Sequence, residues 1–265
     1  MRLKIAHTTE YAYDRPVEYA LQKVRLRPTD SPLQTCKDWD ITIEGGGIET
    51  SYEDHFGNRV DLVSADVGTR RLVLRASGTV DTRDAAGVLG KVYGNAPLWL
   101  FQQPTALTRP GPRITELAAT LTNADNVLDG LHALSAATLQ AVPYEAGHTD
   151  VDTTAEDAMT IGKGVCQDHS NIFATAARLA GLPARYVSGY LMMNDRVDQD
   201  ASHAWAEVHV GDLGWVGFDV SNGVSPDDRY VRIATGRDAR DAAPITGLRH
   251  GTAAESMIVS LQVQQ

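Results

Sequence analysis

Hydrophobic and polar residues follow different patterns in the two parts of this chain. In the first third, segments with period-two alternation or a high content of strand-forming residues predict β-strands. These segments lie at about residues 2–13, 17–27, 36–44, 59–65 and 71–80. Turn-prone stretches such as Gly45-Gly-Gly47 and Phe56-Gly-Asn58 separate them. The pattern predicts a small antiparallel β-sandwich or barrel.

A stretch rich in proline and glycine follows the β-rich part. It contains Gly94, Pro97, Pro104, Pro110, Gly111 and Pro112. Such a concentration is typical of a linker or an ordered crossover rather than of a regular element. We therefore expect a β-rich N-terminal domain over residues 1–95, a proline-rich linker over 96–112 and a second domain over 113–265.

The second part begins with apolar residues at three-to-four spacing, which predicts helices over 113–122 and about 125–141. Thr154 precedes two acidic residues, as is typical of a helix start, and Gly162 is the expected end of that short helix. A longer helix is expected over 166–180. Strand patterns then occur at 184–191, 203–210, 214–220 and 257–263.

Composition narrows the possible functions. The formal net charge of -10 argues against nucleic acid, because phosphate binding needs a basic surface. No apolar run approaches the roughly 18–20 residues of a membrane span, and the first residues lack the apolar core of a signal peptide. The two cysteines, Cys36 and Cys166, are too few for a disulfide framework and fit a reducing compartment. We expect a cytoplasmic protein.

An acidic loop is the one feature that suggests a metal. It contains Asp195, Asp198 and Asp200, but it lacks the glycine and the terminal glutamate of a calcium-binding loop. A solvated loop is the simpler interpretation, so we expect neither a metal nor a cofactor.

Cys166 gives the clearest chemical signal. It lies in Gly164-Val-Cys-Gln-Asp168, at the predicted start of a helix. The helix dipole and a protonated histidine nearby would favour the thiolate, which is the form that attacks carbonyls. The first-turn N–H groups, including that of Cys166, could stabilise an oxyanion. Gly164 would let the chain turn into the helix without a side chain that blocks the substrate.

Two predicted strands downstream carry a histidine and an aspartate. His203 lies on the polar face of its strand, with Trp205 and Glu207, which favours a role in a site over a role in the core. Asp219 follows on the next strand, beyond a turn at 211–214. A loop of those four residues alone would turn Asp219 away from His203, whereas an odd loop or one bulge would place it opposite Trp205 and within reach. A Cys–His–Asp group therefore predicts an odd register here.

Several other residues have competing interpretations. His169 lies one helical turn beyond Cys166 and could compete as the base, although a strand-borne histidine can be braced by an acid. Asp168 is expected to stabilise the helix dipole. Cys36 lies on a predicted strand without a motif and is expected to be structural.

The second oxyanion donor cannot be fixed from spacing. Tyr144, in Val142-Pro-Tyr-Glu, is our candidate, and the backbone N–H of Gln167 is the runner-up. Trp205 could wall the acyl pocket or shield the His–Asp pair.

Ordered motifs across nearly the whole chain resemble bacterial transglutaminase-like proteins, often described as transglutaminase-like cysteine peptidases. The core motifs are Gly164-Val-Cys-Gln-Asp168, Gly181-Leu-Pro-Ala-Arg-Tyr-Val-Ser-Gly-Tyr190, Ser202-His-Ala-Trp-Ala-Glu207 and Gly214-Trp-Val-Gly-Phe-Asp219. The segments His7-Thr-Thr-Glu-Tyr11, Gln22-Lys-Val-Arg-Leu-Arg-Pro28 and Phe56-Gly-Asn58 resemble the β-rich N-terminal domain that accompanies this core.

The resemblance implies an α+β, papain-like core with Cys166 as nucleophile, His203 as base and Asp219 as the orienting acid. Two departures concern the pocket mouth. The chain has His169-Ser-Asn171 where the family often has an aromatic-Ala-His run, and Asp219-Val-Ser-Asn222 where it often has Asp-Pro-Thr-Asn. Both could alter substrate choice, and neither removes a member of the expected triad.

The expected function is thiol-dependent acyl transfer on a protein or peptide amide, through a thioester. Water would resolve the thioester by hydrolysis and an amine by cross-linking, and we favour hydrolysis. One alternative is a catalytically silent module of the same fold that binds peptides or proteins. Another is acetyl transfer from a thioester donor, as in arylamine acetyltransferases that also use Cys-His-Asp.

Overall fold

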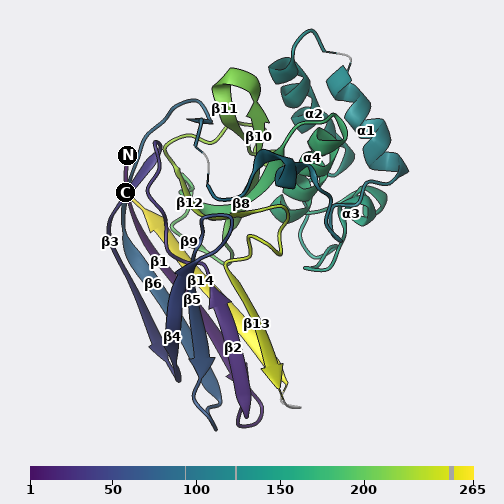
Figure 1. The fold of residues 1–265 in the computed structure, drawn as a ribbon. Coiled ribbons are helices and arrows are strands. Elements are labelled where there is room, and N and C mark those ends of the chain that lie inside the picture. The colour runs from purple at the N-terminus through teal and green to yellow at the C-terminus, as the bar shows by residue number, and fades with distance from the viewer. Residues whose placement is uncertain (93, 123, 251–253) are drawn as a thin grey trace.

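The computed structural model describes residues 1–92, 94–122, 124–250 and 254–265, and within them the strands form three sheets. Two sheets face each other as a sandwich. The third sheet and the helices lie together at one end of that sandwich (Figure 1). This is the mixed α and β architecture, with a β-rich N-terminal region, that the sequence predicts.

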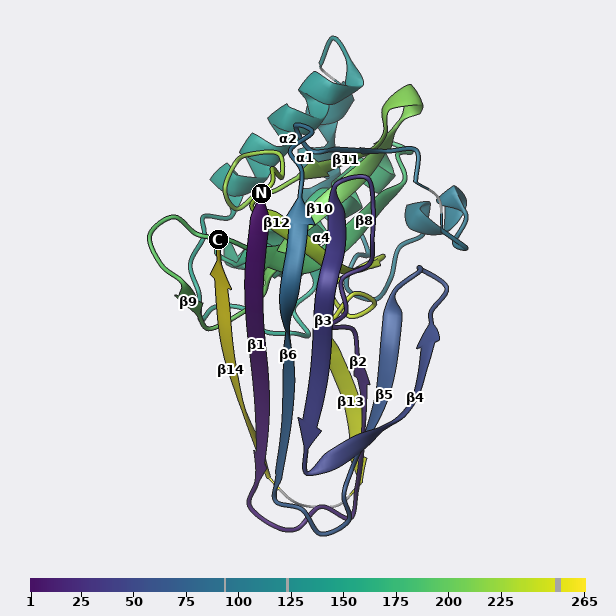
Figure 2. The ribbon, with the colours of Figure 1, turned by 90° about the vertical axis from the view of Figure 1, so that its left-hand side faces the viewer.

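The sandwich uses strands from both ends of the chain. One sheet has the order β3 (Gln34–Glu44), β6 (Arg71–Thr82), β1 (Arg2–Tyr13), β14 (Glu255–Gln264) and β9 (Asp198–Gln199). The other has the order β13 (Ile245–His250), β2 (Tyr19–Val24), β5 (Arg59–Ala65) and β4 (Gly46–Glu53). Figure 2 shows β1 between β6 and β14 in the first of these sheets. Because alternate residues of β1 are buried, its apolar side chains, such as Leu3 and Ile5, belong to the core of the sandwich.

The third sheet carries the helical part of the molecule. Its order is β12 (Tyr230–Gly236), β8 (Ala184–Leu191), β10 (His203–Val210), β11 (Gly214–Phe218) and β7 (Val88–Gly90). The helices are α1 (Pro112–Thr122), α2 (Val127–Ala141), α3 (Ala155–Ile161) and α4 (Cys166–Leu179). Helix α4 packs on β10, and Phe173 joins Ala206 and Phe218 in a buried cluster there. Among the described helices, none is long and apolar enough to cross a membrane.

Local signals placed the helix ends well. The side chain of Thr154 accepts a hydrogen bond from the N–H of Asp157 at 3.1 Å, and Gly162 ends α3 in a left-handed conformation with φ +72°. Strand β4 was not expected, because its first glycines looked like part of a turn. Only Gly45 turns the chain, at φ +80°, and β4 begins directly after it.

The proline-rich segment is an ordered crossover. It contains a short 3-10 helix, Leu98–Gln102, whose Phe101 is buried with its ring centroid 5.2 Å from that of Trp215. The segment is therefore fixed to the third sheet rather than acting as a free linker.

The end of the chain corrects the expected division into domains. Strand β14 pairs with β1 and strand β13 pairs with β2, so residues 245–250 and 255–264 complete the N-terminal sandwich. The predicted second domain, residues 113–265, is therefore wrong at its C-terminal end, because its last two strands belong to the sandwich. A local sequence pattern predicts a strand, but it does not show which strand, more than 200 residues away, that strand pairs with.

Candidate active site

Helix α4 presents Cys166 at its first position, as expected, on a tightly held turn. The carboxylate of Asp168 accepts hydrogen bonds from the N–H of Val165 at 2.8 Å and from the hydroxyl of Thr149 at 2.7 Å. Asp168 is buried and caps the helix. Cys166 itself is half-buried, so that its sulfur is held on a fixed helix end and still meets a cavity.

The reason for glycine at position 164 differs from the expected one. Gly164 does not adopt a left-handed conformation, and a Cβ built on it would lie 2.8 Å from a carboxylate oxygen of Asp168. The missing side chain makes room for the capping carboxylate rather than for a substrate. Gly164 therefore affects Cys166 indirectly, because it allows Asp168 to cap the helix that begins with Cys166.

The hairpin of β10 and β11 has the odd register that the expected Cys–His–Asp group requires. Val210 pairs with Gly214 across a three-residue turn, Gly211–Leu213, and Ala206 pairs with Phe218. Continuing this register places Asp219 opposite Trp205, diagonal to His203. The Nε2 atom of His203 lies 2.6 Å from Oδ2 of Asp219. The expected odd parity is confirmed.

Asp219 is fully buried and accepts hydrogen bonds from three residues. Besides His203, the hydroxyl of Tyr230 donates at 2.7 Å, and Asn222 donates through its side chain at 2.7 Å and its backbone N–H at 3.2 Å. Burial opposes the charge of Asp219, but the hydrogen bonds from His203, Asn222 and Tyr230 hold the pKa of this carboxyl below its usual value.

Asn222 and Tyr230 were not predicted as site residues. Asn222 lies in a turn that Asp219 closes by pairing with Val224, so its contact with Asp219 is local. The sequence feature that could have predicted this contact is a turn-prone Asn three residues after the acid. Tyr230 begins β12, and no local pattern connects it to Asp219.

His203 connects the acid to the cysteine. Burial lowers its pKa, but hydrogen bonds of its ring to Asp219 and Cys166 outweigh burial and raise the pKa of His203 to about 10. Because Nε2 faces Asp219, Nδ1 is the ring nitrogen left for Cys166. The histidine is thus an imidazolium at neutral pH, placed between the sulfur and a carboxylate.

His169 does not have the geometry of a competing base. Its Nδ1 lies 2.8 Å from the hydroxyl of Ser221 and its Nε2 lies 2.7 Å from the carbonyl oxygen of Val142. Burial lowers the pKa of His169, so the ring is neutral and both nitrogens are engaged. This histidine joins α4 to the turn after Asp219.

The structure places the remaining expected residues, Trp205, Gln167 and Tyr144, in three different settings. Trp205 stacks beside the ring of His203, with centroids 6.4 Å apart, and packs edge-on against Tyr230, so it covers the histidine rather than the groove. Gln167 lines the groove, and its side chain donates to the carbonyl of Asp150 at 3.2 Å. Tyr144 is 56% exposed, and the partial burial of its phenol, followed by the nearby Cys166, raises its pKa.

A groove of about 340 Å³ opens beside Cys166, where the third sheet meets the sandwich. Its core side includes Cys166, Gln167, Tyr186, His203 and Ala239. Its sandwich side includes His7, Thr9, Tyr11, Met257 and Val259, from β1 and β14. The N-terminal region therefore forms one wall of the candidate active site.

Comparison with known proteins agrees with this arrangement. Residues 115–220 match the transglutaminase-like superfamily, and residues 3–81 match the bacterial transglutaminase-like N-terminal region. An uncharacterised protein of Mycobacterium leprae is 26% identical over 275 residues, which cover 99% of this chain and 98% of that protein. An uncharacterised protein of Mycobacterium tuberculosis is 28% identical over 294 residues, covering 99% and 91%.

A solved structure shares the fold along the whole chain. It is a Cytophaga hutchinsonii protein that carries a provisional name as a cysteine protease. The two superpose with a TM-score of 0.80 at 24% identity, covering 100% of this chain and 91% of the other. The expected fold and the expected family resemblance are confirmed.

Proposed function

Because residues 115–220 match the transglutaminase-like superfamily and residues 3–81 match its bacterial N-terminal region, we propose that this protein breaks amide bonds of proteins or peptides through a thioester on Cys166. The observation that carries the proposal is the position of His203, which contacts Asp219 on one side and Cys166 on the other. Such a chain of contacts is what an activated thiol needs.

The first step forms the thioester. The sulfur of Cys166 attacks the amide carbonyl carbon, and a C–S bond forms as the carbonyl oxygen gains negative charge. The N–H of Cys166, at the start of α4, supports that oxygen, and Tyr144 or Gln167 would supply the second donor. His203 then gives its proton to the amide nitrogen, the C–N bond breaks and an amine leaves.

The second step releases the acyl group. His203, now neutral, takes a proton from the incoming nucleophile, which attacks the thioester carbon. The C–S bond then breaks, the sulfur of Cys166 leaves as the thiolate, and His203 is again protonated. Water yields a carboxylic acid, and an amine yields a new amide. We favour water because the groove is open to solvent, with Val151 69% and Met257 56% exposed.

The acyl-enzyme is the species to test. A p-nitrophenyl ester has a good leaving group, so an acyl-enzyme should accumulate and add the acyl mass to the intact protein. We expect this adduct in the wild type and in Cys36→Ala, and we expect none in Cys166→Ala. An adduct that persists in Cys166→Ala would overturn the assignment of the nucleophile.

Amide cleavage and its outcome need a second assay. An unfolded protein incubated with the enzyme and monodansylcadaverine should gain new N-termini and little dansyl label if water resolves the thioester. Dansyl label without new N-termini would indicate cross-linking instead. If neither product forms and no acyl-enzyme is seen, the silent binding module becomes the better account.

A further inference from the structure

We propose that the sandwich side of the groove is a subsite for an apolar side chain of the substrate, next to the amide that is attacked. This inference deepens the proposed function and rests on it. The subsite is formed by Tyr11, Ile245, Met257 and Val259, which come from β1, β13 and β14.

The inner face of β14 becomes uncovered where it reaches the groove. Residues 257, 259, 261 and 263 share that face, because side chains alternate along a strand. Leu261 and Val263 are buried in the sandwich core at 0% and 1% exposure, whereas Met257 is 56% exposed. The apolar lining of the sandwich thus continues into the groove, where the described residues leave Val259 partly exposed and Met257 mostly exposed.

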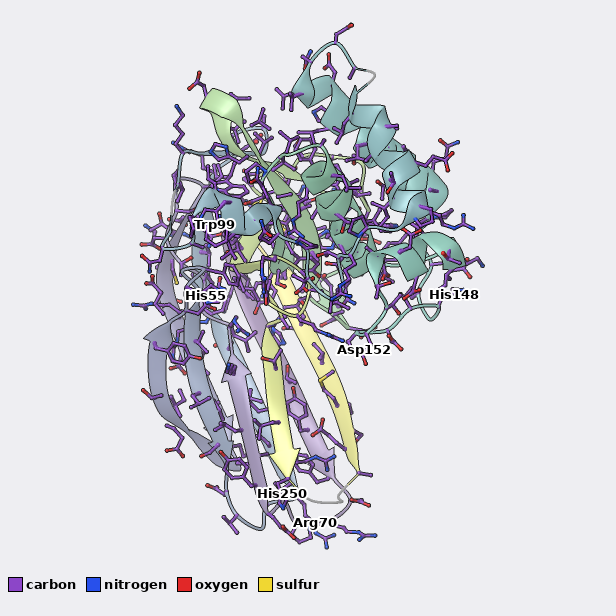
Figure 3. All side chains as sticks on the ribbon, turned by 45° about the vertical axis from the view of Figure 1, so that its right-hand side comes forward. His55, Arg70, Trp99, His148, Asp152 and His250 are labelled. Carbon is purple, nitrogen blue, oxygen red and sulfur yellow. The ribbon has the colours of Figure 1, made fainter. Side chains whose placement is uncertain are left out.

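The position of the uncovered face links it to Cys166. The same cavity is lined by Cys166 and His203 on one side and by Met257 and Val259 on the other. Figure 3 shows Asp152 at the junction of the helical part and the sandwich, and its neighbour Val151 also lines the groove. His250 marks the far tip of the sandwich, away from this junction.

Charge argues for an apolar occupant. None of the described residues that line the groove is Asp, Glu, Lys or Arg. The polar pair on the sandwich wall is already satisfied, since His7 contacts the hydroxyl of Tyr190 at 2.9 Å and that of Thr9 at 3.0 Å. Burial lowers the pKa of His7 to about 4, so this wall is neutral at pH 7. A charged side chain at the sandwich wall would lose hydration without gaining a charged partner from that wall.

Cys166-directed reagents test the subsite without requiring turnover. In a Cys36→Ala background, Cys166 would be alkylated with iodoacetamide and with its N-(2-phenylethyl) derivative, and each rate divided by that of free cysteine. The ratio of the two normalised rates reports the apolar tail alone, because any change in thiol activation affects both reagents. It therefore stays informative if the proposed amide chemistry is wrong.

Two neighbouring residues of β14 provide a matched pair of variants. Met257 lines the groove, whereas Ile258 is 68% exposed and points from the other face of the strand. We expect the tail to accelerate alkylation about ten-fold, Met257→Glu to remove most of that gain, and Ile258→Glu to retain it. No gain in the parent protein, or equal ratios in the two variants, would overturn the subsite.

Discussion

At the scale of single residues, the buried carboxylate of Asp219 determines the state of His203. Its hydrogen bond to the ring raises the pKa of His203 to about 10, so the imidazolium survives at neutral pH despite burial. Tyr230 and Asn222 hold the carboxylate in turn. The candidate site is therefore a line of contacts in which each residue fixes the next.

The shifted pKa values of Asp219 and His203 determine how the stability of the fold depends on pH. The lowered pKa of Asp219 contributes stability that is present above the unfolded value near 3.9 and lost as pH falls. The raised pKa of His203 contributes stability that is complete below about 6.5 and lost as pH rises through about 10. The pair thus stabilises the fold most between about pH 4 and 6.5.

Asp219→Asn should therefore cost more stability at pH 6 than at pH 10. The measurement is the free energy of unfolding in urea for the wild type and the variant at both pH values. A loss of the same size at pH 6 and pH 10 would mean that the His203–Asp219 pair does not carry a proton-linked interaction.

Cys166, His203 and Asp219 could be predicted as site residues from their side-chain chemistry and from the predicted elements that carry them. Cys166, the proposed nucleophile, lies at a helix start, and the parity of one hairpin decides whether His203 and Asp219 meet. Tyr230 was not predictable in the same way, because it reaches Asp219 from a strand whose place in the sheet depends on tertiary packing.

At the scale of elements, the start of α4 depends on the absence of one side chain. Asp168 can cap the helix only because Gly164 leaves space for its carboxylate. The element that presents Cys166 is thus defined by a residue two positions before it.

Gly164→Ala should displace Asp168 and loosen the helix start. We expect a loss of about 1–3 kcal/mol in the free energy of unfolding, as for other overpacked sites, and slower alkylation of Cys166. Gly47→Ala is the control, because a Cβ on Gly47 would meet nothing within 4 Å and the backbone there is not left-handed. Equal effects of the two substitutions would contradict this role of Gly164.

Strand β12 shows why some elements escaped prediction. No strand was predicted over its residues, and Arg232 interrupts its apolar run. In the structure Arg232 forms an ion pair with Glu207, a buried residue of β10 that also pairs with Arg185 at 2.7 Å. A tertiary contact thus overrides the local preference.

At the scale of the whole molecule, two amide side chains attach the sandwich to the third sheet. β12 is an edge strand, and Asn58 bonds to both the N–H and the carbonyl of Thr235, at 2.7 and 2.8 Å. Gln34 does the same for Arg232, at 2.8 and 2.9 Å. Each amide takes the place of a neighbouring strand, which covers the edge and fixes the groove wall.

Asn58→Ala should weaken this attachment. Two buried backbone groups of Thr235 would lose their partners, at a cost of about 1–3 kcal/mol each, so we expect the free energy of unfolding to fall by at least about 2 kcal/mol. Gln262→Ala, which removes an exposed side-chain hydrogen bond, is the control. If urea unfolding shows the same small loss for both, the amides do not hold the two parts together.

The closing of the sandwich by β13 and β14 was the largest feature that the sequence did not reveal. Alternation over 257–263 predicted a strand, and only the assembled fold shows that it pairs with β1 and walls the groove. The groove is thus a product of topology, because one wall comes from the middle of the chain and the other combines strands from its two ends.

If His203 activates Cys166, the pH dependence of Cys166 alkylation must change when His203 is removed. Iodoacetamide rates would be measured from about pH 5 to 10 in Cys36→Ala, with and without His203→Ala. We predict rapid alkylation below pH 7 that slows near neutrality when His203 is removed. An ordinary thiol profile centred near pH 8.5 in both proteins would mean that His203 does not activate Cys166.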